Sequence, residues 1–510
     1  MSTNRLSAAA TPQGSASPSP FGRRSAADTI DSGEPAGRTL GWRKGGLMMA
    51  VTFSLLQMLN EVGTLMAIPL YGSMAAGLGL EPQQVSWALL ATTLCGASTI
   101  ALLAKAGDVF GHRRLMIWCV LGITLGYIVS AIAPNFTVLL IGRFLTGVMA
   151  GQALCLGIMR DRLSSVDRKK AVAVIAAGQA VGVFIGFAFG GLFVALGLSW
   201  RIAFIFGALL TVLSLVAFLR WGDDSDALLR HKGSSRSLDV VGVLLMGLGL
   251  TALCVGISQS MVWGPTSMLT IVAVGLGVVL LVASLVWESR SAHPLVDVKE
   301  MFSARLLPAY TVFLTMGITG MLMFNLVMTW AMLPAPLLGY GFGFNPLFSS
   351  LLFIPMIIAG IVAARYVSRA LVRIPARNVI LGAAFALAAD FVFLRFTHEH
   401  VIAVLVAIFV FGFAYTSLLT TAVSVIALEA REAQAAGTAS VYVAIALAAS
   451  SIGAAIFSAI MGWGSDPITM APRPEVFEVG FTVAAFATIF AIISGLTLSK
   501  QVRLSRIQAH

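Results

Sequence analysis

One charged stretch, Lys105–Ala106–Gly107–Asp108–Val109–Phe110–Gly111–His112–Arg113–Arg114, separates two apolar runs at residues 85–104 and 115–133. Each run is about as long as an α-helix must be to cross the hydrocarbon core of a bilayer. A hairpin between two membrane helices needs only a few polar residues, yet this one carries the ordered pattern Asp–x–x–Gly–x–Arg–Arg. The stretch predicts a tight basic turn between two membrane helices; the plainer alternative is an ordinary cytoplasmic loop.

The composition identifies the class of protein. The 510 residues are 58% hydrophobic and only 11% charged, and their mean hydropathy is +0.92, whereas charged residues make up about a quarter of an ordinary soluble domain. The net charge of +11 comes from basic residues spread in small groups between apolar runs. That spread is typical of membrane topology and not of a nucleic-acid-binding face. The sequence therefore predicts an all-α polytopic membrane protein with no nucleic-acid partner.

The cysteines and the first residues of the chain carry little chemistry. All four cysteines fall inside apolar runs, far apart and without metal-ligand spacing, so we expect buried small hydrophobic residues and no metal site at Cys95, Cys119, Cys155 and Cys254. Residues 1–45 are rich in Ser, Ala, Pro and Gly and lack an apolar core. They predict a disordered cytoplasmic tail and not a signal peptide.

Fourteen apolar runs predict fourteen membrane-spanning helices. They lie near residues 46–72, 85–104, 115–133, 136–159, 171–195, 201–221, 239–259, 267–287, 307–333, 348–370, 378–397, 401–425, 437–462 and 479–498. If the N-terminal tail is cytoplasmic, the loops on its side hold nearly all the basic residues outside the runs, and the other side holds only Arg201, Arg395 and Arg473. Because cationic loops resist translocation, both termini are expected in the cytoplasm.

A weak internal repeat divides the chain. We expect a tail at 1–45, a six-helix half at 46–221, two inserted helices with their loops at 222–305, a second six-helix half at 306–498 and a tail at 499–510. Transporters built from two halves place the substrate site at their interface, near the bilayer midplane.

Three ionisable residues fall well inside the runs: Glu61, Arg143 and Asp390. A charge in hydrocarbon costs a few kcal/mol or more, so such residues usually face a cavity and act there. Glu61 shares one helical face with Gln57, Asn60 and Thr64. That polar stripe indicates a protonatable carboxylate facing a watery cavity, or else hydrogen bonding between helices. Arginine cannot shed its charge, so Arg143 is expected to be a fixed partner for a proton-carrying acid.

The second half offers further candidates. Asp390 is a second proton site or a counter-charge for a cationic substrate, unless an outer vestibule solvates it. A substrate cavity with stacking surfaces for a flat organic molecule is expected from Asn325, Thr329, Trp330, Tyr415 and Tyr442 together with Gln57 and Asn60 of the first half. Aromatic packing between helices is the alternative. The cluster His398–Glu399–His400 predicts a solvated loop.

Three motifs resemble those of the major facilitator superfamily of secondary transporters. In the loop, Asp108, Gly111, Arg113 and Arg114 match the family pattern, while Val109 and His112 replace arginines. In the fourth run, Arg143 begins the pattern Arg–x–x–x–Gly–x–x–x–Gly, and the corresponding place in the twelfth run is Ile408. In the fifth run, Phe187 occupies the proline position of the family's antiporter motif, whose glycines are Gly182, Gly186, Gly190 and Gly191. Small residues at this spacing let a neighbouring helix approach closely.

The first run departs from drug-exporting relatives. Aligned on Pro69, the chain has Asn60 where those relatives have an acid, and Glu61 stands next to it. One residue turns a helical side chain by about 100°, so Glu61 points differently from the family's acid.

The resemblance and the fourteen runs together imply the drug:proton antiporter branch of the superfamily. They imply proton-coupled movement of a small amphipathic or aromatic compound across a bacterial inner membrane by alternating access, in a monomer with no cofactor and no enzymatic activity. Glu61 would carry the proton, Arg143 would tune it, Asp390 would assist, and the Asp108 loop would latch one conformation. Export is favoured; the alternative is an importer of a nutrient such as a riboflavin-like vitamin, since the motif proline is missing.

Overall fold

The computed structural model describes residues 40–148, 151–222, 239–291, 301–304, 306–429, 435–466 and 471–498. Its named elements are all helical, after a short 3-10 turn η1 (Trp42–Lys44). The helices are α1 (Gly46–Leu65), α2 (Tyr71–Leu78), α3 (Pro82–Phe110), α4 (His112–Ala131), α5 (Phe136–Thr146), α6 (Gly151–Arg162), α7 (Ser165–Ala195), α8 (Trp200–Trp221), α10 (Val240–Trp263), α11 (Met268–Arg290), α13 (Leu307–Met332), α14 (Ala335–Leu338), α15 (Pro346–Leu351), α16 (Ile354–Arg373), α17 (Ala376–Thr397), α18 (Val401–Glu429), α19 (Ala435–Gly464), α20 (Pro474–Ala487) and α21 (Ile489–Thr497).

The apolar runs of the sequence become long apolar helices. Among the described residues, ten helical stretches are long and apolar enough to cross a membrane, and two shorter apolar helices lie at Phe136–Thr146 and Val181–Ala195. Every one of the fourteen expected ranges overlaps a helix. The chain is therefore an all-helical, multi-pass membrane protein. The four cysteines are free and buried, as the sequence predicted.

Several expected spans are interrupted, for identifiable reasons. The first run splits into α1 and α2 around Pro69, which cannot continue a helix without losing a backbone hydrogen bond. The last run splits into α20 and α21 because a side chain from α13 enters the break: the Thr315 hydroxyl donates to the carbonyl of Ala487 (3.1 Å) and accepts from the amide of Ala491 (2.9 Å). An inserted hydroxyl of this kind is a known cause of helix kinks.

Polar residues between the apolar runs begin the helices. The Asn135 side chain accepts from the amide of Val138 at the start of α5 (3.0 Å), and Asn345 does the same for Phe348 at the start of α15 (2.8 Å). Asp239 caps α10 through the amide of Gly242 (2.9 Å). Each cap satisfies an amide that the helix itself leaves unpaired, so the polar turns fix where each helix starts.

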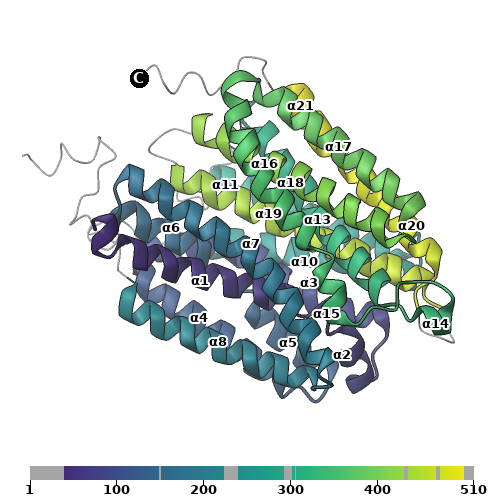
Figure 1. Cartoon of the computed structure of the whole chain (residues 1–510). Coiled ribbons are helices and arrows are strands. Elements are labelled where there is room, and N and C mark those ends of the chain that lie inside the picture. Colours follow the sequence, from purple (N-terminus) through teal and green to yellow (C-terminus); the bar gives the residue numbers. More distant parts are fainter. Residues whose placement is uncertain are drawn as a thin grey trace, which may run out of the picture.

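The helices form two halves that lie side by side (Figure 1). In the first half, α1 packs on α7 and α8, and α4 packs on α5 and α8; in the second, α13 packs on α19, and α18 packs on α16 and α17. The halves meet where α3 packs on α19 and where α7 packs on α15. Here we call the end of the bundle at which α1, α7 and α13 terminate the far end, and the opposite end the near end.

The inserted pair α10 and α11 packs together at the side of this interface. Helix α10 contacts both α3 of the first half and α19 of the second. A hydrogen bond between the Ser258 and Ser458 hydroxyls joins α10 to α19 (2.9 Å). The pair is thus tied to both halves, and α11, whose outer face is rich in exposed Val, Leu and Ile side chains, lies against α10 alone among its main contacts.

Candidate functional site

Arg143 lies at the centre of the first half, in the last turn of α5, with no exposed surface. Its Nε donates to the carbonyl of Ala88 on α3 (3.1 Å), and its Nη2 donates to the carbonyl of Gly63 on α1 (3.0 Å). The guanidinium carbon also lies 5.5 Å from the ring centre of Phe204 on α8. The arginine therefore joins three helices through its side chain. This location agrees with the interior position expected from the sequence.

The Arg143 guanidinium is only partly satisfied. Its Nη1 is buried and has no hydrogen-bond partner, and across the described residues no carboxylate lies within ion-pair distance of it. Its charge is held by backbone carbonyls, which carry only partial negative charge. A buried cation with a free donor can accept an anionic or hydrogen-bonding partner without first breaking an existing contact.

The helix that carries Arg143 ends just beyond it. The backbone carbonyl of Arg143 accepts hydrogen bonds from the Thr92 hydroxyl (3.0 Å) and the Thr146 hydroxyl (2.7 Å), and α5 stops at Thr146. Gly147 follows, and a Cβ added there would collide with the backbone carbonyl of Thr92 on α3. The first glycine of the Arg143 motif thus allows α5 to press against α3, which holds the arginine in place.

Tyr127 on α4 completes the surroundings of the guanidinium. Its ring and hydroxyl occupy a slot between two glycines: a Cβ on Gly63 would collide with the hydroxyl, and a Cβ on Gly207 would lie 2.5 Å from the ring. Tyr127 is 1% exposed and lies near Arg143. Gly63 therefore serves the site twice, because its carbonyl accepts from Arg143 and its missing side chain admits Tyr127.

Glu61 lies on α1, near the carbonyl that Arg143 holds. It is partly buried, and among the described residues no hydrogen bond or ion pair involves its carboxyl group. Its Cβ would lie 3.0 Å from a Cβ added at Gly182 on α7. It also lies near Tyr415 of α18, in the other half. Glu61 is therefore an unpaired acid at the junction between the two halves.

A tyrosine–asparagine pair crosses the same junction. The hydroxyl of Tyr71, at the start of α2, donates to Oδ1 of Asn325 on α13 (3.4 Å), and Nδ2 of Asn325 donates to the carbonyl of Met321 (2.8 Å). Asn325 has no exposed surface. Tyr71 also lies near Arg143. This long hydrogen bond connects the surroundings of the arginine to the second half.

Phe187 on α7 closes the two halves together toward the far end. Its ring stacks on Phe353 (4.8 Å between ring centres, 10° between planes) and meets Phe324 edge-on (5.6 Å). The hydroxyl of Ser350 on α15 donates to the carbonyl of Phe187 (2.7 Å). A Cβ on Gly191 would lie 2.5 Å from the backbone of Pro346. The residue at the motif's proline position is thus a contact between halves.

The other glycines of that run face α1. An added Cβ would lie 2.5 Å from the carbonyl of Met58 at Gly182, 3.1 Å from the Cα of Val62 at Gly186, and 2.5 Å from the carbonyl of Met66 at Gly190. Backbones this close exclude any larger side chain. The glycine run therefore sets the spacing of α7 against α1, the helix that carries Glu61.

Asp390 lies in the second half, 4% exposed on α17, and its Oδ2 has no hydrogen-bond partner. Arg395 does not reach it: Nη1 of Arg395 donates to the Thr482 hydroxyl (2.7 Å), and Nη2 lies 3.9 Å from Oε2 of Glu478. The buried neighbours of Asp390 on its own helix are Leu387, Phe391 and Leu394. The acid is thus not brought together with Glu61 or Arg143 in any described contact.

The predicted cavity residues of the first half face inward. Gln57 and Asn60 line a cavity of about 30 Å³ that Cys119 of α4 and Thr211 of α8 also border. Oε1 of Gln57 is buried without a partner. These two side chains belong to the interior of the first half, whereas Glu61 on the same helix meets α7.

The predicted cavity residues of the second half separate into different places. Thr329 lines a cavity of about 300 Å³ between the halves. Tyr442 stacks on Phe313 (4.8 Å), and Tyr415 packs beside Phe411 (5.3 Å). Trp330 is buried in an aromatic cluster with Phe477 (4.8 Å).

The prediction that His398 is solvated is wrong. His398 is 4% exposed, and its ring meets Trp330 edge-on (4.5 Å) and stacks over Phe477 (6.3 Å). Its Nδ1 lies 3.1 Å from the carbonyl of Leu394, and its Nε2 has no partner. Burial holds the pKa of His398 below its ordinary value. The polar neighbours Glu399 and His400 are exposed, as a loop requires, but the first histidine folds inward.

The charged turn at residues 105–114 joins α3 to α4. Gly111 adopts φ +95° between α3 and α4, a conformation that other residues rarely accept. Nη2 of Arg113 donates to the carbonyl of Leu219 at the end of α8 (2.9 Å), where a cation is favoured by the helix dipole. Arg114 is exposed. The side chain of Asp108 lies outside the described residues.

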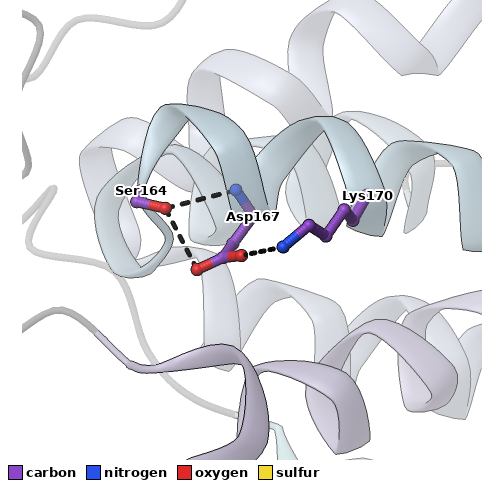
Figure 2. Close-up of polar contacts among 3 residues, drawn as sticks. All are labelled: Ser164, Asp167 and Lys170. Carbon is purple, nitrogen blue, oxygen red and sulfur yellow. Dashed lines mark hydrogen bonds and ion pairs between the residues drawn. The ribbon is translucent and has the colours of Figure 1, made fainter.

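A second polar cluster sits at the start of α7, at the near end (Figure 2). The Ser164 hydroxyl accepts from the amide of Asp167 (3.2 Å) and donates to its Oδ2 (3.1 Å), and Nζ of Lys170 reaches Oδ1 (2.9 Å). The hydrogen bond from Lys170 lowers the pKa of Asp167, and the hydrogen bond from Ser164 acts in the same direction. Lys170 also lies over the ring of Trp42 (5.4 Å). These contacts fasten η1 to α7.

The family of the chain follows from comparison with known proteins. The model of the Major Facilitator Superfamily matches residues 53–453, a range that contains the charged turn, Glu61, Arg143 and Asp390. The chain belongs to this superfamily. It is therefore a multi-pass membrane transporter and not an enzyme.

Curated relatives are about a quarter identical to the chain over the matched residues. The puromycin resistance protein pur8 of Streptomyces alboniger is 27% identical over 354 residues, which are 68% of this chain and 67% of that protein. The putative multidrug resistance protein MdtD of Escherichia coli is 25% identical over 320 residues, 62% of this chain and 64% of that protein. A triacylglyceride transporter of Mycobacteroides abscessus is 27% identical over 48% of each chain. Several other relatives are matched over less than two thirds of their own length.

Solved structures share the fold at low identity. The human organic anion transporter MFSD10 superposes with a TM-score of 0.59 and 15% identity, covering 88% of this chain and 99% of that one. A transporter of the POT family superposes with a TM-score of 0.62 and 15% identity, covering 89% and 98%.

Three residues of the site do not stand out in the sequence. Tyr71 and Tyr127 lie in apolar surroundings where a tyrosine resembles any aromatic core residue. Phe187 is marked there only as a missing proline. The glycines Gly63 and Gly207, on different helices, are the one available signal for Tyr127, but only the fold places them opposite each other.

Proposed function

We propose that the protein exports a small lipophilic or amphipathic organic compound across the bacterial inner membrane, driven by protons that enter in exchange. The proposal includes fourteen spans with both termini in the cytoplasm, because loops rich in basic residues alternate along the sequence with loops that hold few. The names of relatives such as the puromycin, lincomycin and multidrug resistance proteins favour export over the uptake of a nutrient. The chain acts as a monomer in this proposal.

The observation that carries proton coupling is the partly satisfied Arg143, which holds a backbone carbonyl on the helix of the unpaired Glu61. The free Nη1 of Arg143 is fully buried, and its Nη2 holds the carbonyl of Gly63 on the helix of Glu61. An acid with no partner can be buried at lower cost when protonated, and a nearby cation favours its ionised form. A shift of α1 that brings Glu61 toward or away from Arg143 therefore makes the acid release or take up a proton.

The conformation suits the start of an export cycle. The far-end contacts of Phe187, Ser350 and Gly191 hold the halves together. In the proposed topology the far end faces away from the cytoplasm, so the site would be reached from the cytoplasmic side. Protonation of Glu61 then accompanies opening of the far end, and loss of the proton to the cytoplasm returns the transporter.

Transport in everted membrane vesicles tests this function. Vesicles that hold the protein should accumulate a fluorescent drug when respiration acidifies their interior, and a protonophore should abolish accumulation. Glu61→Gln should abolish gradient-driven accumulation, since glutamine cannot carry a proton. The matched control is Glu399→Gln, which removes an exposed acid and should leave accumulation unchanged. Unchanged coupling in Glu61→Gln would refute the assignment.

A further inference from the structure

A cavity of about 300 Å³ opens between the two halves at the far end, apart from the Arg143–Glu61 junction. Its walls come from α2, α3 and the segments just before them on one side and mainly from α13 and α19 on the other. Its volume reaches the lower limit of sites that hold small organic molecules. None of the described residues that line it is charged. A charged ligand would therefore lose its hydration there without gaining an opposite charge.

The chemistry of the walls is nearly uniform. Three methionines, Met328, Met332 and Met461, line the cavity; their flexible thioether side chains adapt to ligands of different shape. The polar side chains are Tyr71 and Thr329. Within the described part of the chain, the Thr329 hydroxyl has no hydrogen-bond partner, although hydroxyls of helical threonines, such as those of Thr315 and Thr319, commonly find one here. The walls of the cavity thus form an apolar surface with one free hydroxyl.

We infer that this cavity is a second binding site, on the exit path, for an uncharged lipophilic molecule with a single hydrogen-bonding group. The apolar part of the molecule contacts the methionines, and its polar group meets the Thr329 hydroxyl. The inference rests on the proposed function, since it names the substrate class that leaves through this end. It goes further in assigning a site separate from the junction where the proton acts.

Tyr71 couples the cavity to that junction. It lines the cavity, its hydroxyl donates to Asn325 (3.4 Å), and it lies near Arg143. A hydrogen bond of this length is weak. A ligand that presses on the Tyr71 ring can therefore break it and separate the halves where they are joined. Binding in the cavity thus favours opening of the far end.

Cysteine protection in detergent-purified protein tests the site without any gradient. The native cysteines are buried, so Thr329→Cys should supply the reactive thiol, and N-ethylmaleimide should label it. N-phenyl-1-naphthylamine, a neutral aromatic amine with one N–H, should slow labelling at least about fivefold, and the permanently charged ethidium should not. Leu337→Cys, whose side chain is 84% exposed at the same end, is the control and should be labelled equally fast with either probe.

A glycine pair makes the test independent of that thiol. Gly72 lines the cavity, and a Cβ added there meets nothing within 4 Å; Gly72→Leu should fill the cavity without a clash and abolish the binding of N-phenyl-1-naphthylamine. Gly122 on α4 has the same open surroundings away from the cavity, so Gly122→Leu should bind normally. The emission of the bound probe measures both variants even if the thiol of Thr329→Cys fails to react.

The outcomes separate this inference from the proposed function. Equal protection by both probes, undiminished binding in Gly72→Leu, or equal protection by added phospholipid would overturn it, the last because the occupant would be a lipid tail. Probe binding that persists while vesicles show no efflux would refute the proposed function and leave the cavity site standing. The Glu61→Gln protein should still bind the probe, since Glu61 does not line the cavity.

Discussion

The two halves of the molecule bury their ionisable residues in different surroundings. In the first half, Arg143 is held by the carbonyls of Ala88 and Gly63. In the second half, Asp390 has a buried oxygen with no partner, and the counterpart of Arg143 in the sequence is the fully buried Ile408. The first half thus holds a fixed cation where the second half has an apolar core.

The difference indicates that the two halves have different roles in transport. The Arg143 guanidinium donates to backbone carbonyls of two helices, so its hydrogen bonds depend on the relative position of those helices. The second half contributes aromatic surfaces instead: Phe324 and Phe353 receive Phe187 from the first half. We expect the first half to bind the proton and the second half to supply the aromatic surface against which the first half moves.

The largest effect on transport is expected for Arg143→Lys. Lysine keeps the charge but cannot place two donors on the carbonyls of Ala88 and Gly63 at once. Losing a buried charged hydrogen bond costs roughly 1.5–3 kcal/mol, so gradient-driven transport should fall about 10- to 100-fold. Initial rates in everted vesicles, normalised to protein content, measure this.

The matched control for that variant is Arg395→Lys, in which the arginine is partly exposed and bonds to Thr482. We expect its transport to remain near that of the unchanged protein. Equal losses in both variants would mean that the first half holds no special cation.

Gly63→Ala tests the packing of the first half, because Gly63 touches both Arg143 and Tyr127. The new methyl group collides with the Tyr127 hydroxyl, and overpacking of this kind typically costs about 1–3 kcal/mol. Melting of the purified protein in detergent should occur at a clearly lower temperature. Adding Tyr127→Phe removes the hydroxyl and should restore most of the loss.

Rescue by the second substitution is the decisive part. If Tyr127→Phe fails to improve Gly63→Ala, the slot between Gly63 and Gly207 does not determine how closely α1 and α4 approach. Tyr127→Phe alone tests whether the hydroxyl matters to transport apart from packing.

Much of this fold could be predicted from the sequence, because the signals of membrane helices are local. The apolar runs, the glycine run of α7 and the buried position of Arg143 all follow from residue type and spacing. The contacts that join the halves do not. Tyr71 and Asn325 are 254 positions apart, and nothing in the pattern around either residue pairs them. The prediction for His398 is wrong because Glu399 and His400 dominate the local polarity, whereas its own ring is covered by residues from α13 and α20.

Phe187→Ala tests the contribution of the second half's aromatic surface. Two ring contacts disappear, each worth about 0.5–1.5 kcal/mol, so the far-end-closed state should lose about 5- to 150-fold in population relative to the open one. Labelling of Thr329→Cys by N-ethylmaleimide should quicken accordingly. Phe189→Ala is the control, since Phe189 on the same helix packs on Phe206 within the first half; equal acceleration there would remove Phe187 from the contact between halves.

The smallest effect expected concerns His398, a titratable group buried in the aromatic cluster of the second half. Burial lowers its pKa against the opposing effects of the Leu394 and Arg395 backbone and of Glu399 and Glu478. The folded protein therefore keeps the ring neutral at a pH where the unfolded chain has begun to bind a proton. Stability from this residue is complete above the ordinary value of 6.5 and is lost as the pH falls below it toward the folded pKa. The melting temperature should thus drop by a few degrees between about pH 7 and pH 5.

Two histidine variants decide whether the slope of melting temperature against pH comes from His398. His398→Phe keeps a ring against Trp330 and should flatten the slope, while His400→Phe, at an exposed position, should leave it intact. A pH dependence that survives His398→Phe would assign the sensitivity to another group, but not to Asp167. Its pKa is lowered by Lys170, so its contribution is present above the ordinary value of 3.8 and fades only at more acidic pH.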